Sequence, residues 1–183
     1  MRCFVAISLP DEVRKEVVCA QGQLRKLDLH AKWVETENLH VTLKFLGEVD
    51  EGCIANIKEI LSKITSLTGS FDLILSDVGG FPSLCKPRVL WMGINPDEIP
   101  VKIIEFLGNR LEGLGFPKEE RKPHPHITLA RIKSPKNIHK IKQTVASLNL
   151  NKIEWQVSKV CLFKSILTSR GPTYGEVFSQ SLV

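Results

Sequence analysis

The chain has 183 residues, the length of one domain or of two small lobes that share a core. Hydrophobic residues make up 43% of it and charged residues 25%, a composition that excludes a disordered protein. No apolar run is long enough to cross a bilayer, and no signal peptide is apparent, so we expect a cytoplasmic protein without a membrane partner. Lysine and arginine number 25 against 20 acidic residues, and the net charge of +5 is compatible with a polyanionic partner.

The five cysteines are an odd number, lie far apart and include no CxxC pair. This spacing excludes a zinc ribbon and a thioredoxin-like redox site. We expect reduced and mostly buried thiols at Cys3, Cys19, Cys53, Cys85 and Cys161.

Strands and helices alternate in the first half of the sequence. The first helix would bury Val13, Val17, Ala20 and Leu24, which recur near helical spacing. A loop rich in glycine, proline and serine separates the last two strands of this half. In chain order, the pattern predicts a strand over 2–8, a helix from 11 to about 26, strands over 31–34 and 39–46, a helix over 50–64, and strands over 71–78 and 89–94.

The same order of landmarks then recurs. Three pairs of similar segments lie 87, 86 and 82 residues apart: AISLPDEV and GINPDEI, HVTL and HITL, and SDVGGF and SKVCLF. We therefore expect an internal repeat, with halves of about 1–92 and 93–183, that forms a single domain of two lobes related by a pseudo-two-fold axis. Neither helix opens on a glycine-rich phosphate loop, which argues against a parallel doubly wound sheet. The predicted fold class is α+β, with mainly antiparallel sheets flanked by helices.

The repeated His-x-Thr-Leu motif carries the clearest chemical signal. Residues i and i+2 of a strand share a face, roughly 7 Å apart, so His40 lies with Thr42, and His126 lies with Thr128. Across a two-fold axis, the two pairs would face each other in a central cleft. One imidazole can accept a proton from a nucleophile while the other donates a proton to the leaving group. The hydroxyls can donate hydrogen bonds to phosphodiester oxygens. A single copy would more often be structural, but two copies at equivalent points of a repeat favour catalysis.

Two longer segments around these motifs, KWVETENLHVTLKFLG over 32–47 and HPHITLAR over 124–131, resemble the 2H phosphoesterase superfamily. Within it, the sequence is most similar to the RNA 2′,3′-cyclic phosphodiesterases, also called 2′-5′ RNA ligases, over essentially the whole chain. The resemblance implies a bilobal fold with both HxTx motifs in a central cleft. It also implies hydrolysis of RNA 2′,3′-cyclic phosphate ends to 2′-phosphate ends, with no metal and no cofactor. The same chemistry with a 5′-hydroxyl as nucleophile would join RNA ends through a 2′-5′ linkage without ATP.

The resemblance also assigns roles to individual residues. It makes His40 the proton donor and His126 the proton acceptor. It places Thr42 and Thr128 on the phosphate-holding threonines, and Arg131 on a basic residue after the second motif. The substrates it implies are RNA with a 2′,3′-cyclic phosphate end, such as a tRNA fragment, or a small cyclic nucleotide. The default form is a monomer, because the cleft is built within one chain.

Strand alternation does not settle the roles of three residues close to the motifs. It puts Arg131 on the face opposite the second motif, so that only a strand end, a twist or a bulge would bring it to the cleft. Phe45 stands at the equivalent place of the first motif, where it either offers a surface to a base or packs in the core. Lys44 shares the face of the first motif and either meets a phosphate or is solvated.

Two other functions stay open at this point. The chain could be a binding module for a nucleotide or an RNA end with little turnover, although binding alone does not require two proton-transfer groups. It could also be a zinc hydrolase with His40, His124 and His126 as ligands, although Asn38 stands where the first motif would match His124. The remaining aromatic and basic residues are expected in the core or on the solvated surface: Trp33, Trp91 and Tyr174 in the core, and His30, His139, Lys86–Arg88 and Lys118–Lys122 in solvent.

Overall fold

A computed structural model gives the fold, and it describes residues 1–169 and 171–182. In this part of the chain the helices are α1 (Asp11–Arg25), α2 (Ile54–Ser62), α3 (Glu98–Glu112) and α4 (Ile141–Ser147). The strands are β1 (Arg2–Ser8), β2 (Ala31–Trp33), β3 (His40–Glu48), β4 (Phe71–Phe81), β5 (Val89–Asn95), β6 (His126–Ile132), β7 (Glu154–Val157), β8 (Lys159–Thr168) and β9 (Gly171–Ser181).

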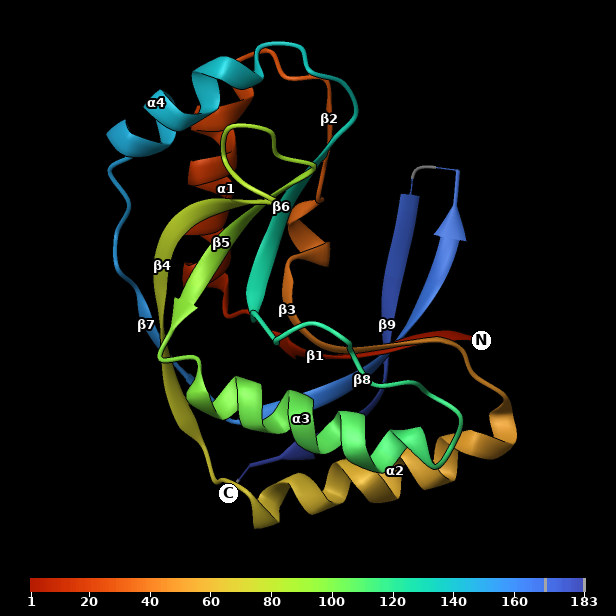
Figure 1. Cartoon of the computed structure of the whole chain (residues 1–183). Coiled ribbons are helices and arrows are strands. Elements are labelled where there is room, and N and C mark those ends of the chain that lie inside the picture. Colours follow the sequence, from red (N-terminus) through yellow and green to blue (C-terminus); the bar gives the residue numbers. More distant parts are fainter. Residues whose placement is uncertain (170, 183) are drawn as a thin grey trace.

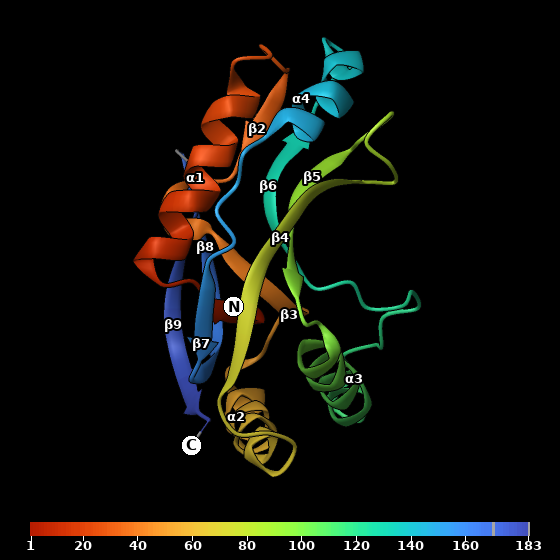
Figure 2. The same cartoon turned by 90° about the vertical axis from the view of Figure 1, so that its left-hand side faces the viewer.

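These nine strands form one curled sheet, in which every pair of neighbouring strands is antiparallel. The strand order is β7-β4-β5-β6-β3-β1-β8-β9, and β2 is an additional partner of β6. Helices α1 and α4 pack together at one end of the molecule, and α2 and α3 pack together at the other (Figures 1 and 2). The prediction of an α+β fold with antiparallel sheets flanked by helices is confirmed.

The pairing of β6 with β3 joins two groups of strands within the sheet. On one side lie β7, β4, β5 and β6, with β2 as the additional partner of β6, and on the other side lie β3, β1, β8 and β9. The expected boundary of the sequence repeat, between residues 92 and 93, falls inside β5. Each group of strands therefore contains strands from both halves of the sequence.

The helical periodicity of the first helix agrees with its packing. Val13, Val17, Ala20 and Leu24 are all fully buried on one face of α1, which lies against the sheet. The helix predicted over 50–64 is present, but it consists of α2 with a short 3₁₀ turn before it and another after it. None of the helices in the described residues has the length and hydropathy that a membrane span requires.

The structure differs from the sequence predictions at one strand and at three of the cysteines. The short strand β7, between α4 and β8, was not predicted, because four residues give too little alternation to recognise. All five cysteines are free thiols, as expected, but only Cys3 and Cys161 are buried. Cys53 is half-buried, and Cys19 and Cys85 are exposed on the surface.

Candidate active site

The two histidine motifs meet where β3 and β6 pair in the middle of the sheet. This pairing sets Val41 opposite Ile127, and both of these side chains are fully buried on one face. The residues on either side of this pair point to the other face, because side chains alternate along a strand. Antiparallel register then places the histidine of each motif beside the threonine of the other. The four motif side chains therefore lie together on one face of the sheet.

A β-bulge follows each motif at the same position. The register of β1 against β3 skips Leu43, and the register of β5 against β6 skips Leu129. An extra residue of this kind shifts the alternation of the side chains beyond it by one position. Phe45 and Arg131 therefore come to the same face as the motif threonines. The bulge explains how Arg131 reaches the cleft, which simple alternation does not.

A cavity of about 660 Å³ lies over this face of the sheet. Its other walls come from β1, from β2 and its flanking segments, and from the hairpin of β8 and β9, which forms one edge of the sheet (Figure 1). His126 is not part of the lining but lies close enough for its charge to affect the pKa of His40. Five of the predicted site residues line the cavity: His40, Thr42, Phe45, Thr128 and Arg131.

The ring of each motif histidine is held by the backbone carbonyl two residues earlier. Nδ1 of His40 donates to the oxygen of Asn38 over 2.7 Å, and Nδ1 of His126 donates to the oxygen of His124 over 2.7 Å. Each neutral ring therefore carries its hydrogen on Nδ1 and a lone pair on Nε2. The hydroxyl of Thr42 donates to Nε2 of His40 over 2.9 Å. Both rings are thus oriented to exchange a proton through Nε2.

Burial lowers the pKa of both histidines below the ordinary imidazole value. For His40, desolvation is the main cause, the hydrogen bond to Asn38 opposes it, and the charge of His126 adds to it. For His126, desolvation is again the main cause, the hydrogen bond to His124 opposes it, and the charges of His124 and Arg131 add to it. An anion bound between the rings would favour the protonated form of each.

Aromatic side chains pack around both imidazoles and contribute to their burial. Phe4 and Tyr174 lie with their ring centroids 4.8 and 5.5 Å from that of His40, and Tyr174 stands edge-on to it. Phe81 and Trp91 lie 5.1 and 6.1 Å from the ring of the other motif histidine. For each imidazole, one of these two rings comes from the adjacent strand, which is β1 for His40 and β5 for His126. The other ring comes from a more distant strand, β9 or β4.

Several aromatic residues are more exposed than their sequence pattern predicts. Trp33 and Tyr174 are half-buried and line the cavity. Trp33 also packs against the core, as predicted, whereas the prediction of a core position is wrong for Tyr174. Trp91 is half-buried beside the second motif rather than in the core. Phe45 is 61% exposed and also lines the cavity, which excludes core packing. Aromatic rings around a cavity are as large and apolar as core residues, so composition alone does not distinguish the two.

The prediction that Lys44 shares the face of the first motif is wrong. The bulge at Leu43 turns this side chain away from the cavity, and Lys44 is only 3% exposed. Its ammonium donates to the backbone oxygen of Pro117 and lies 3.4 Å from the carboxylate of Glu119. Lys44 therefore ties β3 to the segment after α3 and does not meet a ligand in the cavity.

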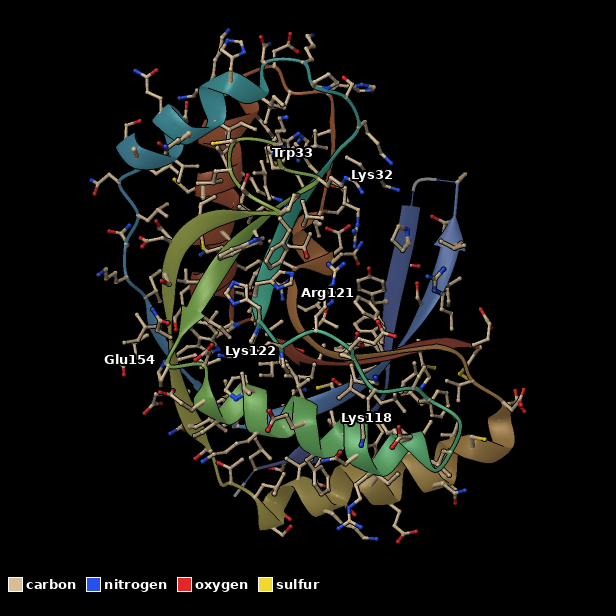
Figure 3. The ribbon with its side chains drawn as sticks, in the orientation of Figure 1. Lys32, Trp33, Lys118, Arg121, Lys122 and Glu154 are labelled. Carbon is tan, nitrogen blue, oxygen red and sulfur yellow. The ribbon has the colours of Figure 1, made fainter. Side chains whose placement is uncertain are left out.

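The charged and histidine-containing loops are exposed, as predicted. His30 and His139 are on the surface, and so are the charged residues of 118–122, among them Arg121 and Lys122 on the segment that connects α3 to β6 (Figure 3). Lys86 and Arg88 are exposed as well, on the connection between β4 and β5.

The geometry gives no support to the three-histidine zinc site. Within residues 1–169 and 171–182, no three of the histidine, cysteine, aspartate and glutamate side chains gather closely enough to hold one ion. The ring centroids of His124 and His126 are 6.2 Å apart, and Nδ1 of His126 is engaged with a backbone carbonyl. His124 instead packs edge-on against Trp91, with 4.6 Å between the ring centroids.

Asn38 is a site residue that the sequence analysis did not identify as functional. It is buried, and its side-chain amide donates to the backbone oxygen of Pro172 over 2.7 Å, while its own carbonyl holds His40. One residue thereby connects the β8–β9 hairpin to the first motif histidine. The only signal in the sequence was its place two residues before the motif, which matches that of His124 in the second half.

Comparison with known proteins agrees with this architecture. The model of a family described as LigT like Phosphoesterase matches residues 7–91 and 95–174, which is most of the chain. The chain belongs to this phosphoesterase family. The resemblance found in the sequence is therefore confirmed, and both HxTx motifs fall within the matched segments.

Curated relatives extend over nearly the whole chain. A Methanocaldococcus jannaschii protein is 37% identical over 175 residues, which are 95% of this chain and 96% of that protein. A Thermotoga maritima protein is 37% identical over 174 residues, which are 95% of this chain and 91% of that protein. Both are named RNA 2′,3′-cyclic phosphodiesterase.

Solved structures share the fold. The crystal structure of the Thermus thermophilus protein TT0787 matches with a TM-score of 0.82 and 31% identity, over 100% of this chain and 98% of that one. The structure of Escherichia coli LigT complexed with 3′-AMP matches with a TM-score of 0.78 and 25% identity, over 99% of this chain and 97% of that one.

Proposed function

We propose that this protein is an enzyme that hydrolyses the 2′,3′-cyclic phosphate at the end of an RNA to a 2′-phosphate. The observation that carries the proposal is a pair of imidazoles on one face of β3 and β6, each with Nδ1 bonded to a backbone carbonyl, which leaves Nε2 for proton transfer. The names of relatives at 37% identity support the cyclic phosphodiester as substrate class. A nucleotide bound to a protein of the same fold supports a nucleotide ligand.

The reaction would proceed by transfer of two protons. Neutral His126 accepts a proton from water at Nε2 while the water oxygen forms a bond to phosphorus. The bond between phosphorus and the 3′ oxygen breaks, and protonated His40 donates its Nε2 hydrogen to that oxygen. The products are a 2′-phosphate and a 3′-hydroxyl, and the two histidines exchange protonation states. A proton exchange with solvent then restores the starting state.

The phosphate would be held between the two motifs. The hydroxyls of Thr42 and Thr128 are proposed to donate to its nonbridging oxygens, and both of them line the cavity. The guanidinium of Arg131 would neutralise part of the negative charge, in the planar geometry that suits a phosphate. Phe45 is 61% exposed beside these groups and would offer its ring to the terminal base.

Three further properties are expected of this site. Two imidazoles suffice for both proton transfers, so we expect turnover to continue in a metal chelator. With the 5′-hydroxyl of a second RNA in place of water, the same displacement would join RNA ends through a 2′-5′ linkage. The cavity lies within one chain, so a monomer is expected to be active on RNA ends such as those of tRNA fragments.

The direct test is incubation with an oligonucleotide that ends in a 2′,3′-cyclic phosphate, in the presence of EDTA, followed by identification of the product. We expect a 2′-phosphate, and we expect His40→Ala and His126→Ala each to lower turnover by at least ~10²-fold. A 3′-phosphate product, or wild-type turnover in either variant, would contradict the proposal.

A sulfur-containing substrate separates the roles of the two histidines. When sulfur replaces the leaving 3′ oxygen, the departing thiolate needs no proton, because a thiol has a pKa of about 8.5. We expect this substitution to restore turnover in His40→Ala, which lacks the proton donor, but not in His126→Ala, which lacks the base. Restoration in His126→Ala alone would reverse the two assignments.

A further inference from the structure

A second hollow lies next to the proposed active site. Its volume is about 490 Å³, and it lies between the β4–β5 connection and the segment that follows β6. Lys133 lines both the active-site cavity and this hollow, so the two spaces adjoin. The hydrogen bond from the Ile132 amide to the Arg88 carbonyl, 2.9 Å long, fixes the two segments against each other.

Positive charge continues from one space into the other. The active-site cavity is lined by five basic residues and one acidic residue, Glu35, and the second hollow is lined by three basic residues and no acidic one. Among the described residues, none of these cations forms an ion pair with a carboxylate. The seven cations are Arg2, Arg25, Lys32, Arg131 and Lys133 in the cavity, and Lys86 and Arg88 with Lys133 again in the hollow.

Two of these cations stand directly opposite each other in the sheet. Lys32 of β2 pairs in register with Arg131 of β6, and Lys32 lies on the side of β2 that faces the β8–β9 hairpin (Figure 3). Like charges at opposed positions of neighbouring strands destabilise a sheet. This arrangement is unfavourable for the free protein and becomes favourable when an anion lies between the two side chains. An anion is therefore the ligand that this surface fits.

The positions of the cations on β6 and on the neighbouring β4–β5 connection give the ligand a direction. Arg131 lies three residues after Thr128, and Lys133 lies two residues farther on, which is about 7 Å at the rise of a strand. Arg88 lies beside this segment, because its carbonyl accepts a hydrogen bond from the Ile132 amide, and Lys86 precedes it by two residues on the same connection. The positive charges therefore lead away from His126 and across to the β4–β5 connection. A ligand with a phosphate at regular intervals matches such a series better than a single phosphate does.

We infer that the second hollow binds backbone phosphates of an RNA strand whose cyclic end occupies the active site. This inference rests on the proposed function and extends it. The substrate is a single-stranded RNA end of several nucleotides, and its 5′ side leaves the active site past Arg131 and Lys133 toward Lys86 and Arg88. A cyclic mononucleotide would occupy the active site alone.

Kinetics with oligonucleotides of different length test the inference. The substrates are a dinucleotide and an octanucleotide, each with a 2′,3′-cyclic phosphate end, at a series of salt concentrations. The variant is Lys86→Ala/Arg88→Ala, and the matched control is Lys15→Ala/Lys102→Ala, which removes the same charge from exposed positions on α1 and α3.

We expect the wild type to have a lower KM for the octanucleotide than for the dinucleotide. The Lys86→Ala/Arg88→Ala variant should lose this advantage, and the slope of log KM against log salt should fall by about 0.7 for each lost phosphate contact. The control variant should follow the wild type. Equal KM values for both lengths in the wild type, or a wild-type length dependence in Lys86→Ala/Arg88→Ala, would overturn the inference.

A binding measurement keeps this result separate from the proposed activity. The probe is a fluorescent octanucleotide that ends in a 2′-phosphate, titrated with each protein. Weaker binding by Lys86→Ala/Arg88→Ala than by the control supports the second hollow even if the wild type hydrolyses no substrate, a result that would contradict the proposed function alone. Equal binding by the two variants contradicts the inference alone.

Discussion

Nδ1 of His40 and Nδ1 of His126 make the same hydrogen bond, 2.7 Å long, to the carbonyl oxygen of the residue two positions earlier. The two imidazoles therefore have the same tautomer and present the same atom, Nε2, from two strands that pair with each other. Burial also lowers the pKa of both. Because the two imidazoles have the same tautomer and similar surroundings, one can act as the acid and the other as the base only when the first is protonated and the second is neutral.

The pH dependence of kcat/KM follows from these pKa shifts. In the free protein, the base must be neutral and the acid protonated, and both pKa values are lowered. We therefore expect a bell-shaped profile whose optimum lies below ~6.5, the ordinary imidazole value. The bound phosphate favours the imidazolium, so the profile of kcat should lie at higher pH than that of kcat/KM. A kcat/KM optimum above neutral pH would contradict this prediction.

Substitutions of Arg131 and Lys44 test whether the bulges bring Arg131 to the cavity and turn Lys44 away from it. Arg131→Gln should raise KM or lower kcat by roughly 10–150-fold, because a hydrogen bond to a charged group contributes about 1.5–3 kcal/mol. Lys44→Gln should leave both constants near their wild-type values and lower the melting temperature, because its ammonium is bonded to Pro117 and Glu119. Steady-state kinetics and thermal unfolding of both variants distinguish the two. The reverse pattern would place Lys44, and not Arg131, at the phosphate.

Asn38 is expected to act as a positioning residue for His40. Asn38→Ala removes the 2.7 Å hydrogen bond to the Pro172 carbonyl, and so loosens the segment whose own carbonyl holds the imidazole. We expect kcat to fall about fivefold, the equivalent of ~1 kcal/mol for one neutral hydrogen bond. The alkaline limb of the pH profile should move to lower pH, since the bond to Asn38 raises the pKa of His40. Asn95→Ala, at an exposed position bonded to Ser76, is the control and should leave the profile unchanged.

Gly79 leaves room for the indole of Trp91, which packs near the imidazole of His126. A Cβ at this position would overlap the indole of Trp91, its partner in the β4–β5 pairing. Gly79→Ala should therefore displace Trp91, destabilise the fold by about 1–3 kcal/mol and lower kcat. Gly22→Ala is the control, because nothing lies within 4 Å of a Cβ there and alanine favours the α1 helix. A Gly79→Ala protein as stable and active as Gly22→Ala would refute the contact.

The cysteines should differ in their reaction with iodoacetamide. Burial raises the pKa of Cys161 to about 11 and also raises that of Cys3, so neither forms the reactive thiolate in the folded protein. Cys19 and Cys85 are exposed. Mass spectrometry of the native protein should find modification first at Cys19 and Cys85, and at Cys3 and Cys161 only after unfolding. Early modification of Cys161 in the native state would contradict its burial.

The sequence alone determined the features that depend on local periodicity and on repetition. The buried face of α1 followed from the helical spacing of Val13 and Leu24 and the apolar residues between them, because a regular helix brings such positions to one side. The i and i+2 geometry of a strand predicted that the histidine and the threonine of each motif share one face. The recurrence of the motif predicted that His40 and His126 belong to one site.

Which neighbours of the motifs reach the cavity depends on the pairing of distant strands in three dimensions. The bulges at Leu43 and Leu129 arise from the pairing of β3 with β1 and of β6 with β5, and a register between distant strands is not encoded in local alternation. A shift of one residue brings Phe45 and Arg131 to the cavity and turns Lys44 away. The lowered pKa of each histidine likewise depends on rings from other strands, because desolvation is produced by whatever side chains pack around a group in three dimensions.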